Sequence, residues 1–165
     1  MLTIEDRKKR VRAWLAFFVL ALATSGLTAI PLKFEINILN ELAGHGSALA
    51  RLLPALGSWI DYVYRGLMDA YTNYPFLAYG TDWLAFAHIV LAIAFIGPLR
   101  DPANNLWVIE FGMIACVLII PWTLIFGVWR GIPSFWMLVD MSFGIFGVMP
   151  LWVVRREILR IRAAV

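Results

Sequence analysis

Residues 106–128 read LWVIEFGMIACVLIIPWTLIFGV and contain a single charged side chain, that of Glu110. A helix needs about 20 mostly apolar residues to cross the hydrocarbon core of a bilayer. This stretch is long enough, and three further apolar runs accompany it, at about 13–32, 83–99 and 135–154. We therefore predict an all-α integral membrane protein, with residues 1–165 forming a single four-helix transmembrane domain.

The composition of the whole chain agrees with this prediction. Of its 165 residues, 62% are hydrophobic and only 15% are charged, and the mean hydropathy is +0.79. Soluble domains are about 45–50% apolar. The formal net charge of +3 needs no nucleic-acid partner, because the basic residues gather beside the ends of the apolar runs. The expected partner is the lipid bilayer.

The positions of Lys and Arg predict how the chain is oriented. Ten of the 14 lie at the N-terminus, in the 100–105 loop and at the C-terminus, which the four spans place on one side. The other side holds four, namely Lys33, Arg51, Arg65 and Arg130. Because basic residues favour the cytoplasmic side, we predict cytoplasmic termini in a bacterial inner membrane and an external 33–82 segment.

The beginning of the chain also has a second interpretation. Residues 1–23 have a basic start, an apolar stretch and small residues at positions 21 and 23, which resemble the three regions of a cleaved signal peptide. The apolar run continues through Leu27 and Ile30, which is longer than an ordinary signal core. This length favours a retained membrane anchor.

The external 33–82 segment is too long for an unstructured connection. Between Ser47 and Met68, apolar residues recur at intervals of three and four, which predicts an amphipathic helix over about 48–70. A turn at 44–46 separates it from a shorter predicted helix at 34–43. Asp61, Arg65 and Asp69 have the spacing of two exposed ion pairs. We expect this segment to cap the bundle, either as a shield for the span ends or as a lid.

Three ionisable residues, His88, Glu110 and Asp140, lie inside the predicted spans. Such groups are costly in a bilayer and are therefore candidates for function. With a rise of about 1.5 Å per residue, His88 and Asp140 each lie about 8 Å below the outer boundary. Small residues share the helix face of each one, as is typical of helices in close contact. We therefore expect the two side chains to meet in an outer-leaflet pocket.

Further polar residues belong to this predicted pocket. The predicted ligand-binding set is His88, Asp140, Thr28, Thr123 and Asp82. Three interpretations stay open for the His88 and Asp140 pair: a structural hydrogen bond between spans, a ligand site, or proton chemistry in which the carboxylate raises the basicity of the imidazole. These two residues are thus also the candidate catalytic residues.

Residues near the span ends and two prolines within the spans have expected structural roles. Glu110 is expected to reach the headgroups or to pair with Arg155. Thr81 or Asp82 is the expected N-cap of the second span, and Asp101 followed by Pro102 that of the third. Pro121 and Pro150 are expected to kink their helices.

Several kinds of chemistry lack their required residues. Cys116 is the one cysteine, which excludes intramolecular disulfides and CxxC chemistry. Two histidines, His45 and His88, leave little for a haem or multi-histidine metal site. GxSxG and HExxH motifs are missing from the sequence. We expect no metal and no cofactor.

Two classes of function fit these residues. The first is a non-enzymatic membrane module that binds a lipidic ligand or a membrane-protein partner through the outer-leaflet pocket. The alternative is a membrane enzyme that acts on a lipid-soluble substrate by acid and base catalysis with His88 and Asp140. A proton or ion carrier ranks third, because the sequence shows no inverted repeat.

Overall fold

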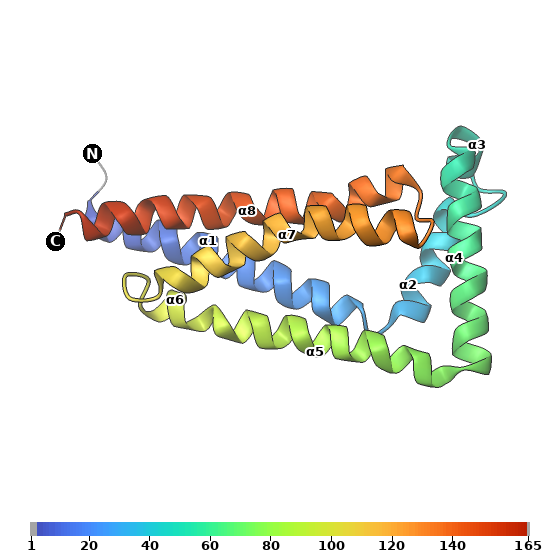
Figure 1. The fold of residues 1–165 in the computed structure, drawn as a ribbon, viewed down its shortest axis with the longest axis horizontal. Coiled ribbons are helices and arrows are strands. Elements are labelled where there is room, and N and C mark those ends of the chain that lie inside the picture. Colours follow the sequence, from blue (N-terminus) through green and yellow to red (C-terminus); the bar gives the residue numbers. More distant parts are fainter. Residues whose placement is uncertain (1–2, 165) are drawn as a thin grey trace. The chain divides into compact units, whose positions relative to one another are not determined.

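The computed structural model describes residues 3–164, and in this range it contains helices and no strand. In chain order (Figure 1) the elements are α1 (Ile4–Thr28), α2 (Leu32–Ala43), α3 (Ala48–Leu52), α4 (Pro54–Asn73), the 3-10 helix η1 (Pro75–Ala78), α5 (Tyr79–Ala94), α6 (Ile96–Arg100), α7 (Leu106–Trp129) and α8 (Ser134–Arg162). Four segments are long and apolar enough to cross a membrane: α1, Pro75–Arg100, α7 and α8. The predicted all-helical fold with four candidate spans is therefore confirmed.

The helix ends differ from the predicted span ends. α7 coincides with the predicted 106–128 run, whereas α1 begins at Ile4, α5 begins at Tyr79 and α8 continues to Arg162. Hydropathy marks where a chain becomes polar, and a helix does not have to end there because its backbone hydrogen bonds continue. Both α1 and α8 therefore extend their charged ends as helix beyond the apolar run.

The expected N-caps of the second and third spans are wrong. The Pro75–Ala78 turn leads directly into α5, so Thr81 lies within the first helical turn and its hydroxyl donates to the Ala78 carbonyl at 2.7 Å. Asp101 instead accepts hydrogen bonds from Asn104, and helical structure resumes only at Leu106. In both places the chain forms a local turn where the N-cap was predicted, and the polar side chain bonds within that turn.

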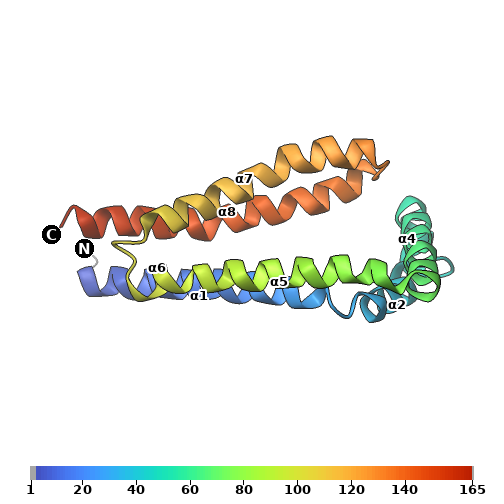
Figure 2. The ribbon, with the colours of Figure 1, turned by 60° about the horizontal axis from the view of Figure 1, so that its bottom comes forward.

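By its contacts the described chain divides into two compact units, 3–22 with 91–164, and 23–90. In the first unit α7 and α8 run antiparallel, side by side in both ribbon views (Figures 1 and 2). Its core consists of Val11, Leu15, Phe95, Ile109, Cys116, Leu151, Val154, Ile158 and Ile161. Glycines allow close approach here, because a side chain at Gly112 would overlap Phe95 and one at Gly144 would overlap the Cys116 carbonyl.

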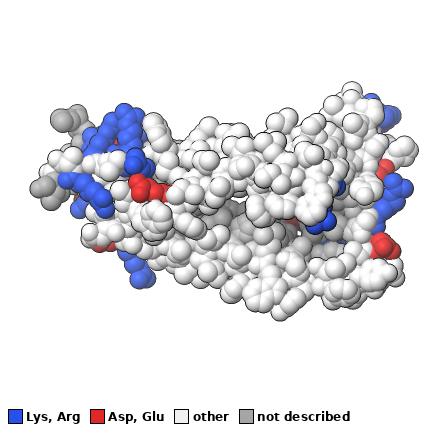
Figure 3. All heavy atoms as spheres, in the orientation of Figure 1, with Lys and Arg blue, Asp and Glu red and all other residues white. Residues whose placement is uncertain are grey.

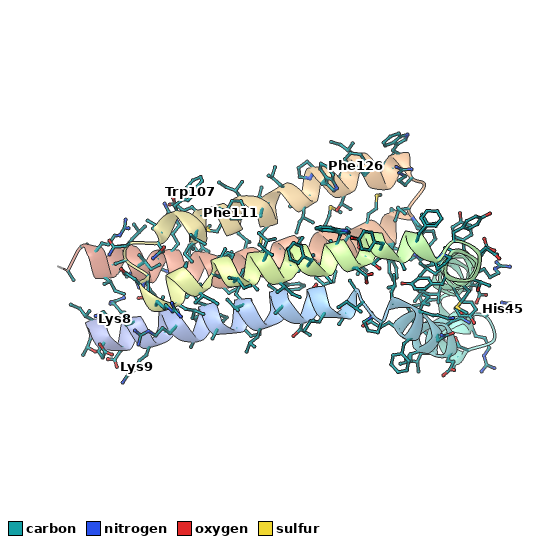
Figure 4. The ribbon with its side chains drawn as sticks, turned by 90° about the horizontal axis from the view of Figure 1, so that it is seen from below. Lys8, Lys9, His45, Trp107, Phe111 and Phe126 are labelled. Carbon is teal, nitrogen blue, oxygen red and sulfur yellow. The ribbon has the colours of Figure 1, made fainter. Side chains whose placement is uncertain are left out.

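The sides of α7 carry large apolar side chains that the fold leaves exposed. Trp107 is 67% exposed and points away from α8 (Figure 4), and Trp122 is 66% exposed. Of the 18 most apolar consecutive residues of α7, only 17% are buried inside the structure. Lys and Arg atoms gather instead at one end of this unit, over the first turns of α1 and the last turns of α8 (Figure 3). This distribution is typical of helices whose sides face lipid and whose ends face headgroups.

In the second unit, α4 packs against α2, α3 and η1. The predicted helix over 48–70 is interrupted, because α3 ends at Leu52 and α4 begins at Pro54, which has no backbone N–H to donate. The predicted 34–43 helix is present as α2. Ser47 caps α3 by accepting a hydrogen bond from the Ala50 backbone N–H at 3.0 Å.

The expected ion pairs on α4 do not form among the described residues. Arg65 donates to the Asp61 backbone carbonyl at 3.3 Å, and the Asp69 carboxylate accepts from Asn73 at 2.7 Å. The Asp61 carboxylate accepts from the backbone N–H of His45 at 3.0 Å. His45 belongs to the turn between α2 and α3 (Figure 4), so Asp61 fixes this turn against α4.

Candidate functional site

The predicted ligand-binding residues fall into both units. His88, Thr28 and Asp82 belong to the 23–90 unit, whereas Asp140 and Thr123 belong to the other. Asp140 and Thr123 are both half-buried on their helices. A meeting of His88 with Asp140 therefore stays a prediction.

His88 is fixed by its own helix. Its Nδ1 lies 2.8 Å from the backbone carbonyl of Leu84. A carbonyl oxygen only accepts, so Nδ1 carries the proton, and in the neutral ring Nε2 is left with a free lone pair. His88 is half-buried, and its Cβ atom contacts α1. A Cβ atom added at Gly26 of α1 would overlap the His88 Cβ. The small residue at Gly26 thus lets α1 and α5 touch beside the imidazole.

The hydroxyl groups near this level bond within their own helices. Thr28 donates to the Ser25 carbonyl at 2.9 Å, and Thr81 donates to Ala78. A hydroxyl that donates to a carbonyl keeps lone pairs with which it can accept. Thr28 can therefore accept a hydrogen bond from a ligand, but its hydroxyl proton is already donated to the Ser25 carbonyl.

A hollow of about 230 Å³ lies on one face of α5 near its beginning, and we call it the aromatic hollow. Tyr79, Asp82, Trp83 and Phe86 line it. Their spacing of three and four residues places them on the same helix face. The Tyr79 and Trp83 rings lie 5.9 Å apart at 83°, and the Trp83 and Phe86 rings lie 5.5 Å apart at 86°. Two successive edge-to-face contacts therefore join the three rings on the helix face that also carries the Asp82 carboxylate.

The strongest polar cluster of the first unit was not predicted from the sequence. Glu157 on α8 is only 2% exposed and forms an ion pair with Arg7 of α1. Arg10 lies 3.6 Å from the same carboxylate and Arg160 donates to it at 3.1 Å. A buried carboxylate is stable only when it is paired and hydrogen-bonded, and this arginine cluster (Arg7, Arg10 and Arg160) satisfies that need. It joins α1 to α8.

The sequence contained one signal for this cluster. Glu157 is the single acidic residue in the basic stretch 155–162, RREILRIR, and it lies on the same face as the buried Ile158 and Ile161. A lone acid among arginines on an apolar face indicates an internal ion pair. Its partner on α1 is 150 residues away, and local spacing does not identify it.

The expected pairing of Glu110 is confirmed. The Nε of Arg155 on α8 donates to the Glu110 carboxylate on α7 at 2.9 Å. Both side chains are more than 30% exposed, so this pair contributes much less to stability than the buried Glu157 pair. Its geometry indicates a structural link between α7 and α8.

No metal site accompanies these groups within residues 3–164, since no three His, Cys, Asp or Glu side chains there are arranged to hold an ion. No protein-family model, no curated protein and no solved structure matches the chain.

Proposed function

We propose that this protein is a membrane module that binds a lipidic ligand without converting it, and that the aromatic hollow of α5 is its binding site. The observation that carries the proposal is the combination of three aromatic side chains and one carboxylate around about 230 Å³ of open space. Ligand sites are concave and mostly apolar, with few polar groups that fix the ligand's orientation. Asp82 supplies that polar group here.

The chemistry of the lining favours a ligand with a positively charged end. An ammonium group is attracted to the faces of Trp and Tyr rings, and a neighbouring carboxylate adds a direct charge interaction. Tyr79, Trp83 and Phe86 are each more than half exposed, so their rings are accessible to a lipid at the surface of α5. The ligand class that fits is a lipid with a choline or ethanolamine headgroup.

The proposed setting is a bacterial inner membrane with both termini in the cytoplasm. The excess of Lys and Arg beside the two ends of the chain supports this orientation. The 33–82 segment, which includes α2 and α4, then lies outside, and the aromatic hollow lies at the level of the outer leaflet. If this surface instead binds a membrane-protein partner, a second protein should co-purify with the chain in place of lipid.

Lipid retention by the purified protein tests the proposal. We expect native mass spectrometry to show that the protein retains phosphatidylethanolamine or phosphatidylcholine, and that this retention depends on Asp82 and Trp83. Asp82→Asn removes the charge at constant size and should weaken this retention about 5-fold. Trp83→Leu removes the central ring and should weaken it about 10-fold.

Two control variants match these changes in chemistry. Asp69→Asn removes an exposed carboxylate on α4, and Trp129→Leu removes a 70% exposed ring on α7. Neither residue lines the aromatic hollow. Equal lipid retention in all four variants would contradict the proposed site. Co-purification of a second protein in place of lipid would show that this surface binds a membrane-protein partner and not a lipid.

A second candidate function rests on His88. Because Nδ1 donates to Leu84, the lone pair of Nε2 is available to accept a proton from a substrate. The candidate is a membrane enzyme that acts on a lipid-soluble substrate with His88 and Asp140 as the acid–base pair. Chemical change of a bound lipid by the intact protein, and its loss in His88→Gln at unchanged lipid retention, would favour this alternative.

A further inference from the structure

A pocket of about 280 Å³ lies between the first turns of α1 and the turn that follows α6, and we call it the basic pocket. Lys8 and Arg12 line it from α1, and Arg100 lines it from the end of α6. Ile158 and Ile161 of α8 form an apolar wall and are themselves at most 5% exposed. All of these residues belong to the first compact unit.

The three cations of the basic pocket differ from four other arginines of the same unit, which form ion pairs. Glu157 and Glu110 form ion pairs with Arg7, Arg10, Arg155 and Arg160. Lys8, Arg12 and Arg100 lie within 4.0 Å of no carboxylate in residues 3–164. Lys8 and Arg12 are also four residues apart on one helix face, where like charges repel. The fold thus holds, at one opening, three cations that form no ion pair among the described residues.

One acidic residue also lines the basic pocket. The carboxylate of Asp101 accepts hydrogen bonds from the Asn104 side chain at 2.7 Å and backbone at 3.3 Å. These two bonds, with the side-chain bond the stronger influence, lower the pKa of Asp101, so this group is ionised. Three cations and one anion leave a charge of +2 in the lining. Arg162 donates to the Ala103 carbonyl and holds the same turn in place.

We propose that the basic pocket binds the phosphate group of an anionic phospholipid. Arg and Lys are the preferred partners of phosphate, and basic pockets between membrane helices hold anionic headgroups. Arg12 directly precedes Ala13, where the apolar run of α1 begins, so the cations lie at the level of the headgroups.

This inference goes beyond the aromatic hollow and does not depend on it. The two sites use opposite chemistry, because the basic pocket attracts a negative group and the aromatic hollow attracts a positive one. A lipid with a net negative charge and no ammonium group, such as phosphatidylglycerol, is therefore a probe for the basic pocket alone. Failure of one site leaves the other unaffected.

The test measures phosphatidylglycerol bound to the full chain in detergent by native mass spectrometry. We expect the double variant Lys8→Gln with Arg12→Gln to weaken binding about 30-fold, since each cation near a membrane surface contributes about a factor of five. Arg100→Gln, at an exposed helix end, should weaken it about 5-fold. The control Lys9→Gln with Arg156→Gln removes the same charge outside the pocket and should change binding less than about 2-fold.

Figure 4 shows why Lys9 is a suitable control, because Lys8 and Lys9 leave α1 on different sides. Equal weakening in the pocket and control variants would overturn the proposal, since binding would then depend on overall charge. Inorganic phosphate in a parallel titration distinguishes the source of the phosphate group. Saturation by inorganic phosphate with no retention of phosphatidylglycerol would also overturn it. If the double variant fails to fold, Arg100→Gln supplies the same comparison alone.

Discussion

Gly144 of α8 lies against the backbone carbonyl of Cys116 of α7, so that even a methyl group does not fit between the two helices. One turn further along, a side chain at Gly147 would approach the Cys116 sulfur at 2.9 Å. Without a hydrophobic force between helices in lipid, association depends on such close backbone contact. The stripe formed by Gly144 and Gly147 is therefore the structural basis of the α7 and α8 pair.

This contact predicts a large effect of a small substitution. Gly144→Ala should lower the free energy of unfolding by about 1–3 kcal/mol, because the methyl group forces α7 and α8 apart. Gly66→Ala on α4 is the control, since an added methyl group there meets nothing within 4 Å and the helix gains up to about 1 kcal/mol. Unfolding in detergent, followed by circular dichroism, measures both, and an unchanged midpoint for Gly144→Ala would contradict the contact.

The buried carboxylate of the arginine cluster predicts a second stability effect. Glu157→Gln leaves the cations of Arg7 and Arg10 without their counter-charge and should destabilise the fold by about 3 kcal/mol. Glu110→Gln breaks a pair that is partly exposed and should have an effect below about 1 kcal/mol. Thermal unfolding of the two variants side by side compares the pairs. A larger effect for Glu110→Gln would show that the arginine cluster is not the main link.

The turn at 101–105 should respond to acid. The folded-state pKa of Asp101 is depressed below 3.8 by its bonds from Asn104, so its stabilising contribution is present above pH 3.8 and is lost as pH falls through the folded value. Hydrogen-exchange protection of the Asn104 amide should fall over that window. The Ala50 amide, bound to the Ser47 hydroxyl, is an internal control because its acceptor does not titrate. Asp101→Asn should remove the pH dependence at Asn104.

The proposed orientation predicts which surfaces a reagent can reach. In a Cys116→Ala background, a cysteine at Ser58 should react with an impermeant thiol reagent in intact cells, whereas a cysteine at Ala163 should not. Lysis should make both reactive, which controls for burial of the introduced thiols. The reverse labelling pattern would place the termini outside and refute the proposed topology.

Much of the architecture is predictable because hydropathy and length describe a spanning helix almost completely. Glu110 and Arg155 also follow from sequence, since the run that starts at Leu106 and the run that ends near Val154 bring them to the same level. The end of α8 was missed for a physical reason. Arg155 and Arg156 mark the end of the apolar run, but Ile158 and Ile161 continue the buried face of the same helix.

The site residues were harder to predict than the spans. The Glu157 and Arg7 pair depends on which helices pack together, and no local spacing contains that information. Asp82 was predicted to bind a ligand, yet its aromatic neighbours Tyr79 and Phe86 form a shared lining only because α5 begins before Trp83. A shift of four residues in a helix start thus decides whether these side chains share a face.

The separation of Arg7 and Glu157 in the chain has a consequence for biosynthesis. Arg7 precedes Glu157 by 150 positions in the chain, so it is made before its partner. Chains are synthesised and begin to fold from the N-terminus, so Arg7 and Arg10 of α1 lack this counter-charge until Glu157 of α8 has been made. The ion pair between Arg7 and Glu157 therefore forms only after most of α8 has been made, because a nascent chain that stops short of Glu157 lacks the carboxylate that joins α8 to α1.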